Sequence, residues 1–198
     1  MSKPGDNRAW GTSVAGLQMS ISGTSNNSKL PEFQVALRNV GQQDIAVSLG
    51  VMLANGKSKF PSKITLNLTD ANGTTRKLRY SKPAYVAGRL DDYVVLLRPI
   101  DRFSSQAAVR EGDRTVTFPD DSIVTVASGP IYSFSIRLSD FWSPDTKEFQ
   151  VALSQGKYQV TAQLEGVGPT LHSSWSSNIA SMKSWKGLLQ SNAFELER

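Results

Sequence analysis

Alternation of apolar and polar residues with a period of two runs through most of the chain and predicts β-strands. The clearest case is the segment 148–166, which contains two alternating runs. Their apolar members are Phe149, Val151 and Leu153 in the first run and Tyr158, Val160, Ala162 and Leu164 in the second. Between the runs, Gly156 supplies the backbone freedom that a tight reversal needs. The pattern therefore predicts a β-hairpin in which one side of each strand faces the core.

The same reasoning predicts short strands along the rest of the chain. They are centred on residues 17–21, 33–37, 45–51, 64–68, 78–80, 115–118, 123–126, 131–138 and 189–196. The dipeptides Asn55-Gly56 and Asn72-Gly73 are typical of tight hairpin turns, and Gly50 predicts a bulge or a weak strand end. Residues 93–97 are apolar throughout, which predicts a strand that is buried on both faces.

Signals for helices are sparse. Residues 104–112 are compatible with a short helix, residues 140–142 with a single helical turn, and the Ser-rich stretch 166–184 with a long loop. The predicted fold class is therefore all-β, an antiparallel immunoglobulin-like β-sandwich with little helix and an elaborated middle at residues 98–130. We expect a flexible N-terminal segment at 1–13 and a single domain at 14–198, with two tandem small sandwiches as the alternative.

Several short motifs occur in the order found in immunoglobulin-like sandwich domains of uncharacterised bacterial proteins. They are Trp10-Gly11 with residues 14–18, the strand at residues 35–41, the turn and strand at residues 153–160, and Trp185-Lys186-Gly187 followed by residues 191–196. The chain resembles these domains over most of its length, but its middle and its 166–184 loop are longer than theirs. Such modules mostly bind or connect other molecules, and the resemblance carries over no catalytic residue.

Composition narrows the class of protein. The chain has 198 residues, of which 39% are hydrophobic and 20% charged, as expected for a folded globular protein. It has no cysteine, which excludes disulfides and a cysteine nucleophile. The start of the chain lacks an apolar signal core, and the longest aliphatic run, residues 94–97, is too short for a membrane span. These features allow a cytoplasmic protein or the mature part of an exported one, and we expect export.

Positive charge is concentrated in one stretch of the sequence. The formal net charge is +5, and residues 57–89 contain eight basic residues and one acid. Pairing through Asn72-Gly73 would collect cations on one hairpin face, and the candidate anion-binding residues are Lys63, Arg76, Lys77, Arg79 and Lys82. An exposed strand edge guarded by lysines would account for the same charges without any ligand.

Aromatic residues near loops are candidates for ligand contact, because exposed rings stack on sugars and anchor interfaces. Tyr80 follows the basic run, and Trp175 lies among serines, so we expect both to contact a ligand. Trp142 follows Asp140-Phe141, and we expect it in the core.

Signals for catalysis or metal binding are weak. The single histidine, His172, lies in a Ser-rich stretch without a nucleophile motif, so a hydrolase is the least favoured class. Asp91-Asp92, Asp120-Asp121 and Asp140 with Asp145 could gather around calcium, although paired aspartates more often cap turns. We predict no catalytic residue, no metal and no cofactor.

The sequence therefore predicts a non-enzymatic binding or structural module, which could be a subunit of a larger extracytoplasmic assembly. Its expected partner is another protein or an anionic glycan or surface, whereas nucleic acid is disfavoured and the oligomeric state is open. A protease inhibitor that inserts its 166–184 loop into a cleft is the main alternative.

Overall fold

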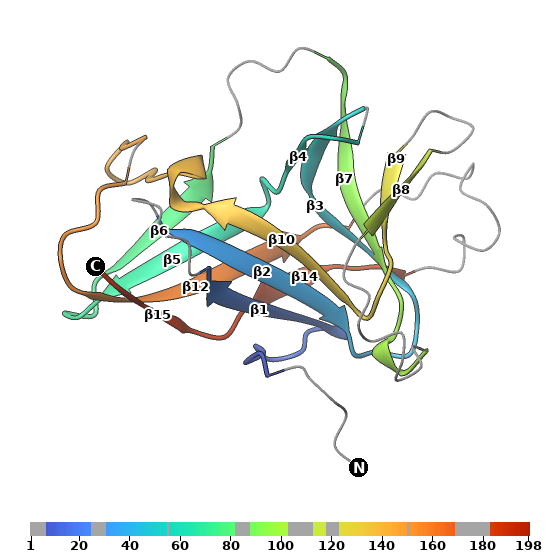
Figure 1. Cartoon of the computed structure of the whole chain (residues 1–198), viewed down its shortest axis with the longest axis horizontal. Helices are drawn as coiled ribbons and strands as arrows, with labels where there is room; N and C mark the ends of the chain where they lie inside the picture. Colours follow the sequence, from blue (N-terminus) through green and yellow to red (C-terminus); the bar gives the residue numbers. More distant parts are fainter. Residues whose placement is uncertain are drawn as a thin grey trace.

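The computed structural model describes residues 7–24, 31–54, 56–81, 88–102, 113–117, 123–149, 151–168 and 183–198 (Figure 1). Strands dominate this part of the chain, and its helical elements are the single 3-10 turns Ile100–Arg102 and Leu138–Asp140. The predicted all-β class with little helix is confirmed. The predicted helix at 104–112 lies outside the described residues.

The strands follow the predicted alternation closely. They are β1 (Leu17–Gly23), β2 (Glu32–Asn39), β3 (Ile45–Leu53), β4 (Lys59–Phe60), β5 (Ile64–Asp70), β6 (Thr75–Tyr80), β7 (Leu90–Leu97), β8 (Asp113–Thr117), β9 (Ile123–Ala127), β10 (Ile131–Arg137), β11 (Phe141–Trp142), β12 (Lys157–Gly166), β13 (Lys183–Ser184), β14 (Gly187–Gln190) and β15 (Phe194–Glu197). The bulge predicted at Gly50 is present, because the β3–β7 register shifts between Ser48 and Gly50.

The described strands form three sheets. Sheet A has the order β1-β2-β10; sheet B has the order β13-β3-β7-β9-β8 with β4 beside β3; sheet C has the order β11-β6-β5-β12-β14 with β15 also beside β12. Most pairs are antiparallel, but β7–β9 and β13–β3 are parallel. In Figure 1, sheet A overlaps β12 and β14 of sheet C, and β1 contacts β12, β14 and β15, so the two sheets face each other as layers.

One large core joins the three sheets. Its fully buried side chains include Met19 and Phe33 from sheet A, Val95 from sheet B, and Leu66 and Val160 from sheet C. Strand β7 is buried on both faces, as predicted for residues 93–97, because its alternate residues belong to a second, smaller apolar cluster. The elaborated middle contributes β8 and β9, which extend sheet B beyond β7.

The predicted hairpin at residues 148–166 is wrong in its first strand. Strand β12 forms, and its residues Val160, Ala162 and Leu164 are buried as expected, whereas Tyr158 is half-buried. Its antiparallel partners, however, are β5 on one side and β14 with β15 on the other. Both edges of β12 are therefore occupied by distant parts of the chain. The described residues of 149–154 form no strand, and Phe149 is 71% exposed.

Trp185 plugs the core beside the first residues of the described chain. It is 1% exposed, and its indole Nε1–H donates to the Val14 carbonyl at 2.9 Å.

The N-terminal segment predicted to be flexible, residues 1–13, is irregular where it is described, but it is tied to β1. The Gly11 N–H donates to the Met19 carbonyl at 2.9 Å, and the Trp10 ring lies 4.0 Å from the Arg38 guanidinium carbon.

Candidate functional site

The basic segment is organised by a tight β5–β6 hairpin, which confirms the Asn72-Gly73 turn. The Asp70 carboxylate accepts the backbone N–H groups of Asn72 and Thr74, both at 2.9 Å. Gly73 has a φ of 81°, in the left-handed region that glycine adopts without steric cost. The turn sequence therefore fixes the register of the hairpin, and the register decides which side of sheet C each cation occupies.

That register divides the basic residues between two faces. Leu66 lies opposite Leu78 and Leu68 opposite Arg76, so Arg76 belongs to the inner, apolar face, at its exposed end. Asn67 lies opposite Lys77 and Thr65 opposite Arg79, which places these two cations on the outer face. Both are exposed, and neither forms an ion pair with the described part of the chain.

Lys63 does not join the hairpin cations. Its ammonium group donates to the Ser48 hydroxyl of β3 at 2.7 Å. Partial burial lowers the pKa of Lys63, and the nearby Asp92 carboxylate opposes that shift. Lys63 is therefore held apart from Lys77 and Arg79, because its long side chain reaches sheet B. Lys82 lies outside the described residues.

Of the two predicted aromatic contacts, only Tyr80 lies among the described residues. Tyr80 lies on the inner face, where its ring packs edge-on against Phe141 with centroids 5.3 Å apart. Burial, reinforced by the Asp140 carboxylate and opposed by Arg137, raises the pKa of Tyr80 to about 12. Trp175 and His172 lie outside the described residues, as does most of the 166–184 loop on which the inhibitor alternative depends.

The outer face of sheet C carries a cross-strand row of four polar side chains with a tryptophan at one end, which we name the outer row. It consists of Trp142, Arg79, Thr65, Gln163 and Gln190, one from each of the neighbouring strands β11, β6, β5, β12 and β14. The amide Nε2 of Gln163 donates to Oε1 of Gln190 at 3.5 Å. Lys77, Asn67 and Thr161 form a parallel second row on the same face. The face therefore presents hydroxyl, amide and cationic groups across five neighbouring strands.

An aromatic pair lies at the β11 end of the outer row. Trp142 is half-exposed rather than in the core, so that prediction is wrong; Phe141 takes the buried position instead. The Trp142 and Phe149 rings stack with centroids 5.8 Å apart and planes at 15°. The Pro144-Asp145 dipeptide was the available sequence signal, because it is typical of the turn that brings the two rings together.

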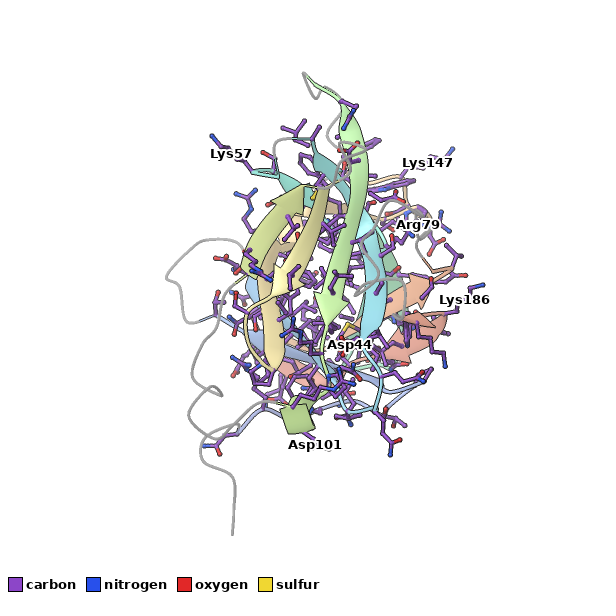
Figure 2. All side chains as sticks on the ribbon, turned by 90° about the vertical axis from the view of Figure 1, so that its right-hand side faces the viewer. Asp44, Lys57, Arg79, Asp101, Lys147 and Lys186 are labelled. Carbon is purple, nitrogen blue, oxygen red and sulfur yellow. The ribbon has the colours of Figure 1, made fainter. Side chains whose placement is uncertain are left out.

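Charge on this face is uneven. Lys77 and Arg79 occupy one side, whereas Glu165, Glu195 and Glu197 lie toward β14 and β15, where Glu195 pairs with Lys157 at 3.2 Å. Figure 2 shows Arg79, Lys147 and Lys186 projecting from the same side of the molecule, with Lys57 on the opposite side. Among the strand residues of this face, the cations without an ion pair in the described part of the chain are therefore those of β6.

A shallow pocket of about 250 Å³ opens at the turn end of the hairpin. Arg76, Asn72, Lys157 and Tyr158 contribute to its lining. Arg76 thus faces a depression distinct from the outer face.

A second group of titratable residues is internal. The Tyr93 and Tyr132 hydroxyls hydrogen-bond to each other, and the Tyr132 hydroxyl donates to Asp113, which pairs with Lys59. Burial raises the pKa of both tyrosines well above the ordinary value. Both phenols therefore stay protonated near neutral pH and serve as hydrogen-bonding groups that connect β7 with β10.

The described residues contain no group of three or more His, Cys, Asp or Glu side chains placed to hold a metal ion. Of the carboxylates considered for calcium, Asp91 pairs with Arg89 and Asp140 with Arg137. Within the same part of the chain, no helix has the length and apolar character needed to cross a membrane.

Comparison with known proteins yields no relative from which residue roles could be taken: no protein-family model matches the sequence, and no curated protein matches it.

Proposed function

We propose that the protein is a non-enzymatic binding module with an immunoglobulin-like sandwich fold, and that it binds an anionic partner on the outer face of sheet C. The observation that carries the proposal is the pair Lys77 and Arg79. Both cations are exposed on the outer face beside hydroxyl and amide groups, without an ion-pair partner in the described part of the chain. Cations left uncompensated beside such groups attract anionic ligands and orient them.

Protection of a strand edge accounts for only part of this arrangement. Lys77 lies where β6 has no further partner among the described strands, so it suits edge protection as well as binding. Arg79 lies opposite Trp142, where β11 already covers the edge of β6. A charge at a covered position gives no protection against edge pairing, which favours a role in binding for Arg79.

The wider setting that we propose is an exported protein that acts as a subunit or connector in an extracytoplasmic assembly. The two facing layers, sheets A and C, and the short motifs shared with bacterial immunoglobulin-like domains support this setting. In such an assembly, an anionic glycan, an anionic surface or an acidic protein patch is a suitable partner for Lys77 and Arg79.

The proposal is tested by retention on a heparin column with a salt gradient. The double variant Lys77→Gln/Arg79→Gln should elute at clearly lower salt than wild type, because screening acts over about 8 Å at physiological ionic strength and fewer contacts are easier to displace. The matched control is Arg76→Gln/Arg114→Gln, which removes two exposed cations from outside the outer face. Elution of both double variants at the same salt concentration would show that only net charge matters and would reject this face as the binding surface.

A further inference from the structure

Phe149 presents an apolar ring beside the proposed anion-binding cations. Its side chain is 71% exposed, although it stacks on Trp142. Trp142 in turn lies opposite Arg79 in the β11–β6 pair. An aromatic ring with a large exposed surface suits stacking against the apolar face of a sugar ring. The aromatic pair and the cations are therefore positioned to act on one ligand.

The position of Phe149 is set by the backbone of a closed turn. The Ser143 N–H donates to the Glu148 carbonyl at 2.9 Å, and the Ser143 hydroxyl accepts the Thr146 N–H at 3.3 Å. Lys147 has a φ of 58°, a left-handed conformation that costs free energy for a residue other than glycine. This strained turn holds Phe149 over Trp142, outside the hydrophobic core.

The outer row continues from this aromatic pair across the sheet. Its members beyond Arg79 are Thr65, Gln163 and Gln190, whose hydroxyl and amide groups both donate and accept hydrogen bonds. Neighbouring strands lie about 4.8 Å apart, so the four intervals from β11 to β14 span about 19 Å. A row of this length matches an extended chain of several sugars that crosses the strands, and it exceeds what a single small molecule would cover.

We infer that the ligand of this face is an acidic polysaccharide in which charged and neutral sugars alternate. One sugar ring stacks on Phe149, a neighbouring carboxylate pairs with Arg79 and Lys77, and neutral rings hydrogen-bond to the rest of the outer row. This inference rests on the proposed function and gives it a substrate class, a binding direction and an aromatic subsite.

The charge distribution favours such a glycan over single-stranded nucleic acid. A nucleic-acid strand carries a phosphate at every nucleotide, and proteins bind it with a positively charged groove that follows the backbone. Here Lys77 and Arg79, the strand cations of this face without an ion pair in the described part of the chain, lie at one end, while Glu165 and the Lys157–Glu195 ion pair lie near the other end. The Glu165 carboxylate would repel a continuous line of phosphates, whereas a polymer with more widely spaced charges can place neutral sugars beside it.

The test uses hyaluronan, a chain of alternating acidic and neutral sugars, in isothermal titration with the full-length protein. Phe149→Ala should weaken binding about five- to tenfold, a loss typical of one aromatic stacking contact. Phe149→Tyr should bind like wild type, because it keeps the ring. The control is Leu90→Ala on sheet B, which removes another exposed apolar side chain and should leave binding unchanged. Neutral dextran and an oligothymidylate serve as comparison ligands.

The outcomes separate this inference from the proposed function. If Lys77→Gln/Arg79→Gln loses hyaluronan binding and Phe149→Ala does not, the stacking site is rejected while the anion-binding face stands. If wild type is retained on heparin but ignores hyaluronan, or prefers dextran or oligothymidylate to it, a polysaccharide of alternating charged and neutral sugars is rejected as the ligand. Weaker hyaluronan binding by both Lys77→Gln/Arg79→Gln and Phe149→Ala, with binding by Leu90→Ala unchanged, supports the inference.

Discussion

The side chain of Asn192 exchanges two hydrogen bonds with the backbone of Ile21. Its Oδ1 accepts the Ile21 N–H at 2.8 Å, and its Nδ2 donates to the Ile21 carbonyl at 3.0 Å. The amide thus acts as a one-residue strand partner for β1, at the point where sheets A and C meet. Because β1 lies at the edge of sheet A, this contact supplies the partners that Ile21 would otherwise lack among the described strands.

Replacement of Asn192 by alanine should destabilise the fold. Both backbone groups of Ile21 would lose their partners, and an unpaired buried group costs about 1–3 kcal/mol. Urea unfolding followed by circular dichroism measures the loss in free energy of unfolding. Asn192→Asp keeps the acceptor and loses the donor, so its stability should lie between those of wild type and Asn192→Ala. Equal stability of all three proteins would show that the two hydrogen bonds between Asn192 and Ile21 do not stabilise the fold.

Gly166→Ala should destabilise the protein by overpacking. A Cβ atom at this position would overlap the ring of Trp185, which is fully buried and anchored through its indole to Val14. Insertion of one methyl group into a packed core costs about 1–3 kcal/mol. The melting temperature should fall accordingly, whereas the neighbouring exposed variant Glu165→Ala should change it little. A melting temperature equal to that of wild type would mean that the Trp185 ring shifts freely.

Val160→Ala tests the register of β12. Val160 is fully buried, with Leu68 beside it on β5 and Phe194 on β15. Loss of its two methyl groups should cost about 1–3 kcal/mol of unfolding free energy. Gln159→Ala, on the outer face of the same strand, is the control and should leave the urea midpoint nearly unchanged. A larger loss of stability for Gln159→Ala than for Val160→Ala would show that the register of β12 is shifted by one residue.

Alkaline pH should weaken the fold through its buried tyrosines. Burial raises the pKa of Tyr93 and Tyr132, and it raises the pKa of Tyr80 to about 12, above the ordinary value of about 10. A phenol with a raised folded-state pKa stabilises the fold fully below its unfolded pKa. That contribution is lost as the pH rises through the folded pKa. The free energy of unfolding should therefore decline from about pH 10 to about pH 12.

Urea titrations at several pH values measure this decline, and tyrosinate absorbance reports the ionisation itself. The double variant Tyr93→Phe/Tyr132→Phe has fewer buried phenols to ionise, so its stability should fall less steeply over the same range. Identical slopes for the two proteins would assign the alkaline loss to groups other than this pair.

Local sequence determined most of the strands and the hairpin that carries the cations. Alternation marks residues such as Leu66 and Val160 as inward-facing, because side chains on a strand point to opposite faces in turn. The Asn72-Gly73 turn is defined by residues within the hairpin itself, since Gly73 adopts a positive φ and Asp70 caps the turn. These features depend on residues within a few positions of each other, so they can be predicted from the sequence alone.

Tertiary structure alone decided which strands pair and which side chains meet. Phe149 shares the alternation of a strand, but β5, β14 and β15 occupy both edges of β12, so the predicted hairpin partner has no place in the sheet. Lys63 is adjacent to the hairpin in sequence, yet its long side chain donates a hydrogen bond to Ser48 on sheet B. The outer row and the contact between Asn192 and Ile21 each join residues that are far apart in the chain. Their formation depends on the packing of whole sheets, which no local pattern encodes.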